Sequence, residues 1–213
     1  IYAYAEQQEL QTLRERARRA NANVATRLIV KKAPDPGAEI CRTATQEAVD
    51  LIVIATHARH HVAHLLIGST TMSVIHDPPA PILAIRYGIR KRQAMQRIVV
   101  PVHLNQTNTA AAELAGAIAR REGSEIHLLI VCSDEERSAA GARLDDVSAR
   151  VGTAVKRAVI RSDDVEKSII RYADDNNADA IFVNAGHDLG TIKQDIIQRA
   201  DTPVMLVPSV AAR

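Results

Sequence analysis

The sequence has 213 residues, of which 46% are apolar, and a formal net charge of +2. A chain of this length can bury roughly 70% of the surface that its unfolded form exposes, enough for one large domain or two small ones. Because the net charge is small and the aromatic side chains are four tyrosines and one phenylalanine, neither charge nor base stacking supports a nucleic-acid partner.

The apolar residues do not gather into a membrane segment. No apolar run approaches the ~18 residues that a membrane helix needs, and no signal peptide is visible. Cys41 and Cys132 lie far apart in the sequence and are expected to be small buried apolar residues in a reducing compartment. These features predict a cytoplasmic chain that does not itself insert into a membrane.

Residues 1–86 alternate between segments typical of helices and of strands. A third helix is expected to begin near Ser69 and to continue through residues 72–77. The apolar run at residues 48–55 is nearly continuous, which is typical of a strand covered on both faces in a parallel sheet. The other predicted elements are helices at 4–23 and 38–49 and strands at 24–33 and 80–86.

Residues 87–95 are charged and non-periodic, and we expect an interdomain linker at residues 89–95. Beyond the linker, five predicted strands alternate with four predicted helices, an order that argues for a parallel, doubly wound sheet. The strands are expected at 96–103, 124–133, 153–162, 177–185 and 202–208, and the helices at 107–123, 134–152, 163–177 and between the last two strands.

The same order of elements occurs twice along the chain. Residues 48–55 and 177–185 each place an aspartate directly before a β-branched run, and each is followed by a helical segment and a strand led by Pro81 or Pro203. The first copy is expected to lack its opening strand, first helix and second strand, as in a fragment of a longer chain. The predicted domains are an incomplete first domain at residues 1–88 and a second domain at residues 96–213.

Residues 50–86 carry a resemblance to a known family. Ala55, Ala58, Gly68 and Ser69 keep the spacing of a phosphate signature, G-x-x-G followed by nine residues and G-[ST], although alanine replaces both leading glycines. This spacing, together with the tandem α/β order, resembles the universal stress protein family. The resemblance implies two tandem Rossmann-like domains of the adenine nucleotide alpha hydrolase type, each built on a five-stranded parallel sheet. It also implies contact between the last strands of two domains, either in a homodimer or as an intramolecular domain pair.

The resemblance implies that the first domain holds ATP or a related adenine nucleotide. Backbone N–H groups and hydroxyls at the start of a helix suit phosphate, and His57 and Arg59 can add charge-assisted contacts. A methyl group at either alanine can obstruct the phosphate, or force an unfavourable dihedral if φ is positive there. The bland alternative is that Ser69 merely caps a helix. The predicted nucleotide-binding residues are Ala55, Thr56, His57, Ala58, Arg59, Gly68, Ser69 and Thr70.

The second domain departs further from the family pattern. The segment from Asn184 to Pro203 is shorter than the matching segment from Ala55 to Pro81, and no G-[ST] stands at the required place. His103 occupies the position where ATP-binding members carry an aspartate. The resemblance therefore implies a degenerate second copy, with ATP bound in the first domain only.

The histidine cluster and the remaining motifs do not predict a metal or an enzyme. His57, His61 and His64 have the spacing of one helix face, but no acidic or cysteine ligand lies nearby and the HExxH pattern is absent. No Ser-His-Asp order, Walker A sequence or paired-carboxylate motif is present. At most, slow ATP hydrolysis is conceivable for the family, with no residue to assign to it.

The sequence thus predicts a nucleotide-responsive binding or regulatory module of the stress response. Two alternatives stay open. The chain can be the cytoplasmic regulatory domain of a membrane transporter, such as a cation/proton antiporter or a permease. It can also be a structural pair of pseudo-domains that binds a protein partner and no nucleotide.

Overall fold

The computed structural model describes residues 11–12, 15, 27, 29, 31–56, 68–86, 95–185 and 190–209. The chain divides into two compact units, residues 1–34 and 35–213. In the first unit, residues 11, 12 and 15 are helical, as predicted for 4–23, and the described residues of the predicted strand 24–33 lie in no helix or strand. The rest of both predicted segments lies outside the described residues.

The second unit alternates helices and strands in the predicted order. We call the part of this unit that falls in the first predicted domain the first half. It contains α2 (Pro36–Gln46), β1 (Ile52–Ala55), α3 (Ser69–His76) and β2 (Ile82–Ile85). The second half of the unit contains β3 (Arg97–Pro101), α4 (Ala110–Glu122), β4 (Glu125–Cys132), α5 (Arg137–Val151), β5 (Val155–Arg161), α6 (Val165–Asp175), β6 (Ala180–Ala185), α7 (Gly190–Arg199) and β7 (Val204–Pro208).

Strand β1 begins four residues later than predicted, at Ile52 instead of Ala48. The preceding residues close α2: Ala48 has a positive φ of 47°, and the N–H of Val49 donates to the carbonyl of Ala44 at 3.0 Å. A left-handed residue with a backward hydrogen bond is a common helix ending. The apolar run therefore serves both the end of a helix and the start of a strand.

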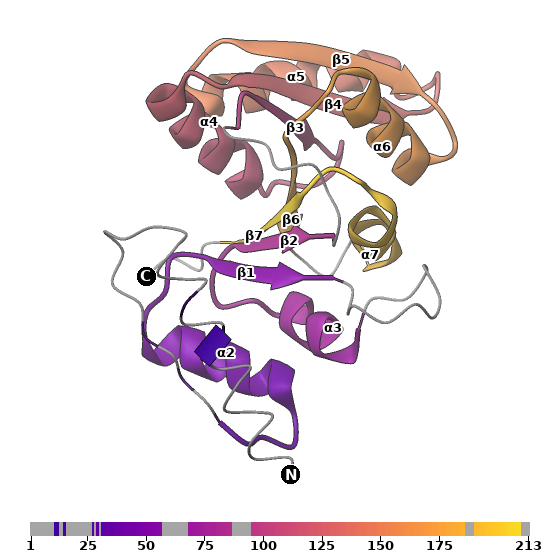
Figure 1. Cartoon of the computed structure of the whole chain (residues 1–213). Coiled ribbons are helices and arrows are strands. Elements are labelled where there is room, and N and C mark those ends of the chain that lie inside the picture. The colour runs from indigo at the N-terminus through magenta and orange to yellow at the C-terminus, as the bar shows by residue number, and fades with distance from the viewer. Residues whose placement is uncertain are drawn as a thin grey trace. The chain divides into compact units, whose positions relative to one another are not determined.

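The described strands form one sheet with the order β1-β2-β7-β6-β3-β4-β5, shown in Figure 1. Within the second half every neighbouring pair is parallel. The predicted parallel, doubly wound sheet is confirmed there, and the order of its strands reverses between β3 and β6. No helix of the described residues is long and apolar enough to cross a membrane.

The two halves meet through their last strands. Strand β2 pairs with β7 in the antiparallel direction, with Leu83 opposite Met205 and Ala84 opposite Val204. On its other side β2 pairs with β1 in the parallel direction. The contact between last strands that the resemblance implied is therefore present within this one chain.

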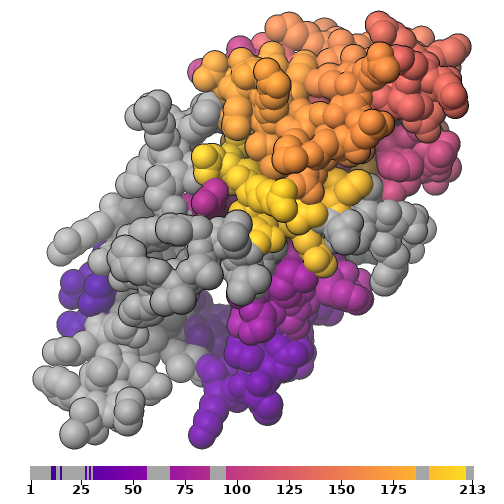
Figure 2. Space-filling model, turned by 90° about the vertical axis from the view of Figure 1, so that its right-hand side faces the viewer, coloured from indigo at the N-terminus to yellow at the C-terminus, as the bar shows by residue number. Residues whose placement is uncertain are grey.

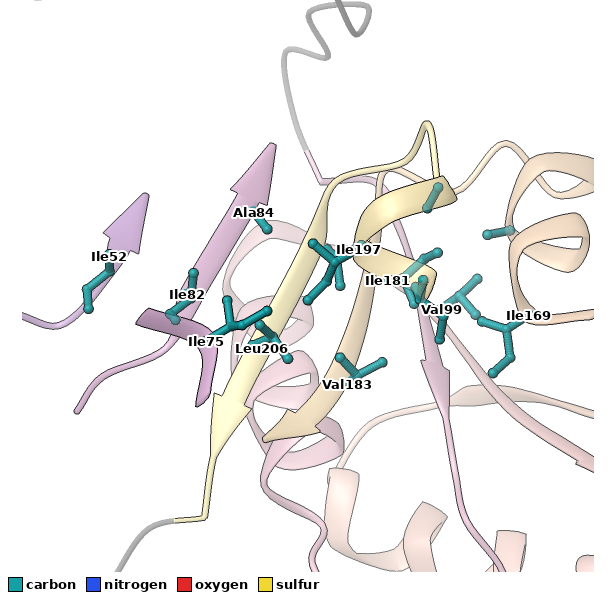
Figure 3. Packing of buried hydrophobic residues seen from close by; sticks show 14 of the residues in the cluster. Ile52, Ile75, Ile82, Ala84, Val99, Ile169, Ile181, Val183, Ile197 and Leu206 are labelled. Atoms are coloured by element: carbon teal, nitrogen blue, oxygen red, sulfur yellow. The ribbon is translucent and has the colours of Figure 1, made fainter. Parts of the chain in front are cut away.

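A continuous apolar core crosses this junction. Figure 3 shows Ile52 and Ile82 of the first half in the same buried cluster as Leu206 and Val183 of the second. Helices α2, α3, α6 and α7 contribute to this cluster, while α4 and α5 cover the other face of the second half. In Figure 2, α7 and β7 (yellow) lie between the orange elements of the second half and the magenta elements of the first. Since fully burying one aliphatic side chain contributes roughly 1.5–3 kcal/mol, the shared core couples the two halves.

Candidate functional site

The predicted phosphate turn lies at the N-terminus of α3. Gly68 is the N-cap residue, with φ −61° and ψ 149°, and no described side chain caps the helix there. Gly68 and Ser69 are exposed, while Thr70 is half-buried. Among the described residues, a Cβ built on Gly68 would have no neighbour within 4 Å. The described residues therefore leave room for a side chain at this position.

The turn is tied to the end of β1. The hydroxyl of Thr71 donates to the carbonyl of Ala55 at 3.5 Å, so the start of α3 stays beside the last residue of the strand. Ala55 is exposed and pairs with Ile85, and its φ is not positive. Alanine at this position of the signature therefore causes no backbone strain.

Thr56, another of the predicted site residues, lies inside the fold. Thr56 is only 2% exposed, and its N–H donates to the carbonyl of Ile85 at 3.0 Å. This N–H extends the pairing of β1 with β2, so Thr56 supports the turn from inside. His57, Ala58 and Arg59 lie outside the described residues.

Helix α2 holds α3 in place from behind. A Cβ built on Gly37 would lie 2.4 Å from Cβ of Ser73 and 2.9 Å from the carbonyl oxygen of Thr70, so the two helices touch at this glycine. Asp35 caps α2 by accepting from the N–H of Gly37 at 2.9 Å, and it also accepts from the hydroxyl of Ser73 at 3.5 Å. The turn at Gly68 thus rests on a closely packed helix pair.

The second half contains a cavity of about 320 Å³ that sequence reasoning missed. It lies at the carboxyl ends of β3, β4 and β6, where the strand order reverses. Ligands of doubly wound sheets bind at this reversal point. The predicted doubly wound sheet implied such a reversal point. A site was predicted only in the first half, because the second half departs from the family motif.

The lining of this cavity combines an apolar floor with a polar rim. The floor is formed by Leu129, Val131, Val183, Ile192 and Ile196. On the rim, Glu136 accepts from the N–H and the hydroxyl of Ser133, both at 3.1 Å, and Asp163 is exposed. The lining therefore includes two acidic side chains.

His103 and Asn184 complete the rim. Nδ1 of His103 accepts from the N–H of Asn105 at 3.1 Å, which orients the ring at the mouth of the cavity. Asn184 accepts from the N–H of Ala111 and donates to the carbonyl of Asn108, both at 2.8 Å. Both groups of the Asn184 amide therefore form hydrogen bonds with the backbone at the start of α4.

The lining contains one cysteine, Cys132. Burial, followed by the charge of Glu136, raises the pKa of the Cys132 thiol, so this side chain stays protonated and is a poor nucleophile. Among the described residues, no group of three or more histidine, cysteine, aspartate or glutamate side chains is arranged to hold a metal ion.

Helix α7 begins with a glycine–hydroxyl pair, Gly190 and Thr191. It occupies the place in the second half that α3, capped by Gly68, occupies in the first. The prediction from fixed spacing overlooked this pair because residues 186–189 alone join β6 to α7, whereas residues 56–68 join β1 to α3.

Comparisons with known proteins agree with this architecture. The family model described as the universal stress protein family matches residues 2–86 and 95–208. A universal stress protein from Archaeoglobus fulgidus is 22% identical with a TM-score of 0.77, over 96% of this chain and 79% of that one. A functionally unknown protein from Pseudomonas aeruginosa is 15% identical with a TM-score of 0.63, over 95% and 78% of the two chains. Both likenesses show a shared fold.

A shorter structure matches about one half of the chain. It is a universal stress protein from Archaeoglobus fulgidus in complex with dAMP, 21% identical with a TM-score of 0.47, over 53% of this chain and 97% of that one. No curated protein matches the chain.

Proposed function

We propose, since this chain belongs to the universal stress protein family, that it is a regulatory module that responds to an adenine nucleotide and not a metabolic enzyme. The ligand is ATP or a related adenine nucleotide, and its phosphates bind in the first half at Gly68, Ser69 and Thr70. The proposed domains are residues 1–88 and 96–213, joined by the linker at 89–95.

The observation that carries the proposal is the open N-terminus of α3. The first hydrogen bond of this helix joins the N–H of Met72 to the carbonyl of Gly68 at 2.9 Å, so the N–H groups of the preceding turn have no partner within the helix. Such N–H groups and the positive end of the helix dipole suit an anion. Within the described part of the chain, Gly68 has room beside it for a ligand.

The remaining predicted residues have distinct roles in this proposal. His57 and Arg59 approach the phosphates with charge-assisted contacts, while Ala55 and Ala58 form the wall that two glycines form in the family signature. Thr56, whose N–H is used in the sheet, positions the turn and does not contact the ligand. We further propose that the protein acts in the cytoplasm.

A calorimetric titration of ATP into the full chain tests this proposal. Gly68→Val places a branched side chain in the open space beside the turn, and we expect ATP affinity to fall by at least about tenfold, or 1.4 kcal/mol. The matched control is Gly141→Val, because a Cβ at Gly141 also has no neighbour within 4 Å and Gly141 lies on α5, away from the turn.

The two variants separate ligand binding from folding. We expect Gly68→Val to change the free energy of unfolding by no more than about 0.5 kcal/mol, as for other surface substitutions. If wild-type protein gives no heat with millimolar ATP, or if both variants bind ATP as wild type does, the nucleotide proposal fails. The structural pair of pseudo-domains would then be the better account.

A further inference from the structure

We propose that the open edge of β1, the side of this strand opposite to β2, binds a protein partner that donates one strand followed by a helix. The donated strand lies parallel to β1. Among the described strands, β1 is the outermost on its side of the sheet and pairs only with β2 (Figure 1). The proposal does not depend on nucleotide binding at Gly68, and a comparison of the two halves supports it.

The second half contains the same pair of strands with this edge occupied. In the first half, the N–H of Ile52 donates to the carbonyl of Pro81 at 2.8 Å. In the second half, the N–H of Ile181 donates to the carbonyl of Pro203 at 2.9 Å. Strand β1 therefore corresponds to β6, and β6 pairs with the parallel strand β3 on its other side. The chain itself thus shows which kind of element fits the open edge.

The backbone of β1 is able to pair on the open side. The N–H groups of Ile52 and Thr56 donate to β2, and successive residues of a strand direct their backbone groups to alternate sides. Val53 therefore directs its N–H and carbonyl away from β2, where no described strand lies. Such groups are a template for pairing with another chain. The opposite outer strand, β5, instead carries exposed Lys156 and Arg157, and charged side chains discourage such pairing.

Asp50 supplies a carboxylate for the start of the donated strand. In the second half, the carboxylate of Asp179 accepts from the N–H groups of Gln96 and Arg97 at 2.9 and 2.8 Å, where β3 begins. Asp50 holds the same position relative to β1 as Asp179 holds relative to β6. It is exposed and has no partner among the described residues. Charge-assisted hydrogen bonds from the first N–H groups of the donated strand fix its direction as parallel.

One face of β1 is covered by helices and the other is not. Ile52 belongs to the apolar cluster with α2 and α3, whereas Leu51 and Val53 are 42% and 60% exposed. Their counterparts in the second half, Ala180 and Phe182, are fully buried in the cluster that α4 and α5 form. A helix that follows the donated strand can bury Leu51 and Val53 in the same way. The partner therefore presents an apolar strand and a helix with an apolar face.

The test uses a synthetic peptide with the sequence of residues 95–123, which contains β3 and α4. This strand and helix occupy the matching edge of the second half, so they are the unit whose fit the fold demonstrates. Binding of the fluorescently labelled peptide to the full chain is measured by anisotropy. We expect saturable binding, and its absence at millimolar concentration overturns the proposal.

Two variants identify the open edge as the place of binding. Val53→Pro removes an N–H from the open side and keeps the N–H groups that β1 donates to β2, and proline is tolerated at such an edge. Asp50→Ala removes the carboxylate. We expect each variant to weaken peptide binding at least about tenfold. Because Asp50 is exposed, its variant remains a test even if Val53→Pro does not fold, and an unchanged affinity there overturns the assigned role of this carboxylate.

The matched controls make the same chemical changes elsewhere. Arg161→Pro alters an exposed residue of the other outer strand, β5, and Glu135→Ala removes a different exposed carboxylate. Both controls should bind the peptide as wild type does. A loss of affinity in the controls equal to the loss in the β1 variants would show that binding occurs away from the open edge.

Two further measurements separate the other possible occupants and directions. With a nitroxide label at the N-terminus of the peptide, NMR signals should broaden more at Asp50 than at Ala55, because the donated strand is parallel to β1. Stronger broadening at Ala55 would show an antiparallel strand and overturn the proposal. Analytical ultracentrifugation of the full chain alone should show no dimer that Val53→Pro dissociates, since such a dimer would assign the open edge to a second copy.

Discussion

Leu83 of β2 lies directly opposite Met205 of β7, and this antiparallel pair lies at the seam where the two halves of the chain become one sheet. Met205 is buried and Leu83 is half-buried against the same apolar cluster. Cross-strand neighbours of this kind stabilise a sheet through side-chain contact. The seam is therefore a packed junction and not only a chain of backbone hydrogen bonds.

We predict that Leu83 and Met205 are energetically coupled. Met205→Ala should cost about 2–5 kcal/mol because the residue is buried, and Leu83→Ala should cost less. In a double-mutant cycle measured by urea unfolding, the coupling should be about 0.5 kcal/mol or more. Two separate unfolding transitions with no coupling between the residues would show that the halves fold independently.

Gly116 is predicted to be indispensable to the packing of α4 on α5. A Cβ at this position would lie 2.3 Å from the carbonyl oxygen of Val151, so Gly116→Ala must push the helices apart. Gly141→Ala is the matched control, since its Cβ would meet no described residue within 4 Å, and it should stabilise the protein by about 0.5–1 kcal/mol through helix propensity. Chemical denaturation should show that Gly116→Ala lowers the free energy of unfolding and that Gly141→Ala raises it. A change of the same sign in both variants would contradict this packing of α4 on α5.

The amide of Asn184 is predicted to stabilise the start of α4 beside the cavity of the second half. Asn184→Leu leaves the N–H of Ala111 and the carbonyl of Asn108 without their partner, and each loss costs about 1–3 kcal/mol if water does not replace it. Amide hydrogen exchange should accelerate at Ala111 more than at the centre of α4. Unchanged exchange at Ala111 would show that this hydrogen bond contributes little.

Glu125 is predicted to make stability depend on pH. Contact with Lys156, followed by His127 and Arg97, lowers its pKa from 4.5 to about 2. Because the folded state holds this proton more weakly than the unfolded state, the stabilisation is present above pH 4.5 and is lost as the pH falls toward 2. Glu125→Gln should flatten this part of the stability curve, whereas exposed Glu122→Gln should not. If Glu125→Gln keeps the wild-type dependence of the free energy of unfolding on pH, another group causes the loss of stability at low pH.

The sheet could be predicted because its strands are continuous apolar runs between helical segments. The predicted helix 38–49 and the predicted strand 48–55 overlapped, and periodicity alone did not show that the strand begins only at Ile52, because one apolar run serves both elements. Nor did the sequence reveal the backbone angle of Ala55, which depends on its pairing with Ile85. The cavity of the second half could not be predicted because its lining comes from loops and strand ends that share no motif. Gly190 did not match the signature because the connection between β6 and α7 is shorter than the one between β1 and α3.

The most direct test of nucleotide recognition in the first half is to follow backbone amide signals by NMR while ATP is added to the full chain. Phosphate binding at the N-terminus of α3 predicts that the signals of Gly68, Ser69 and Thr70 shift most, and that Gly68→Val abolishes these shifts while leaving the rest of the spectrum in place. Shifts confined to the cavity residues of the second half, or no shifts at millimolar ATP, would contradict it.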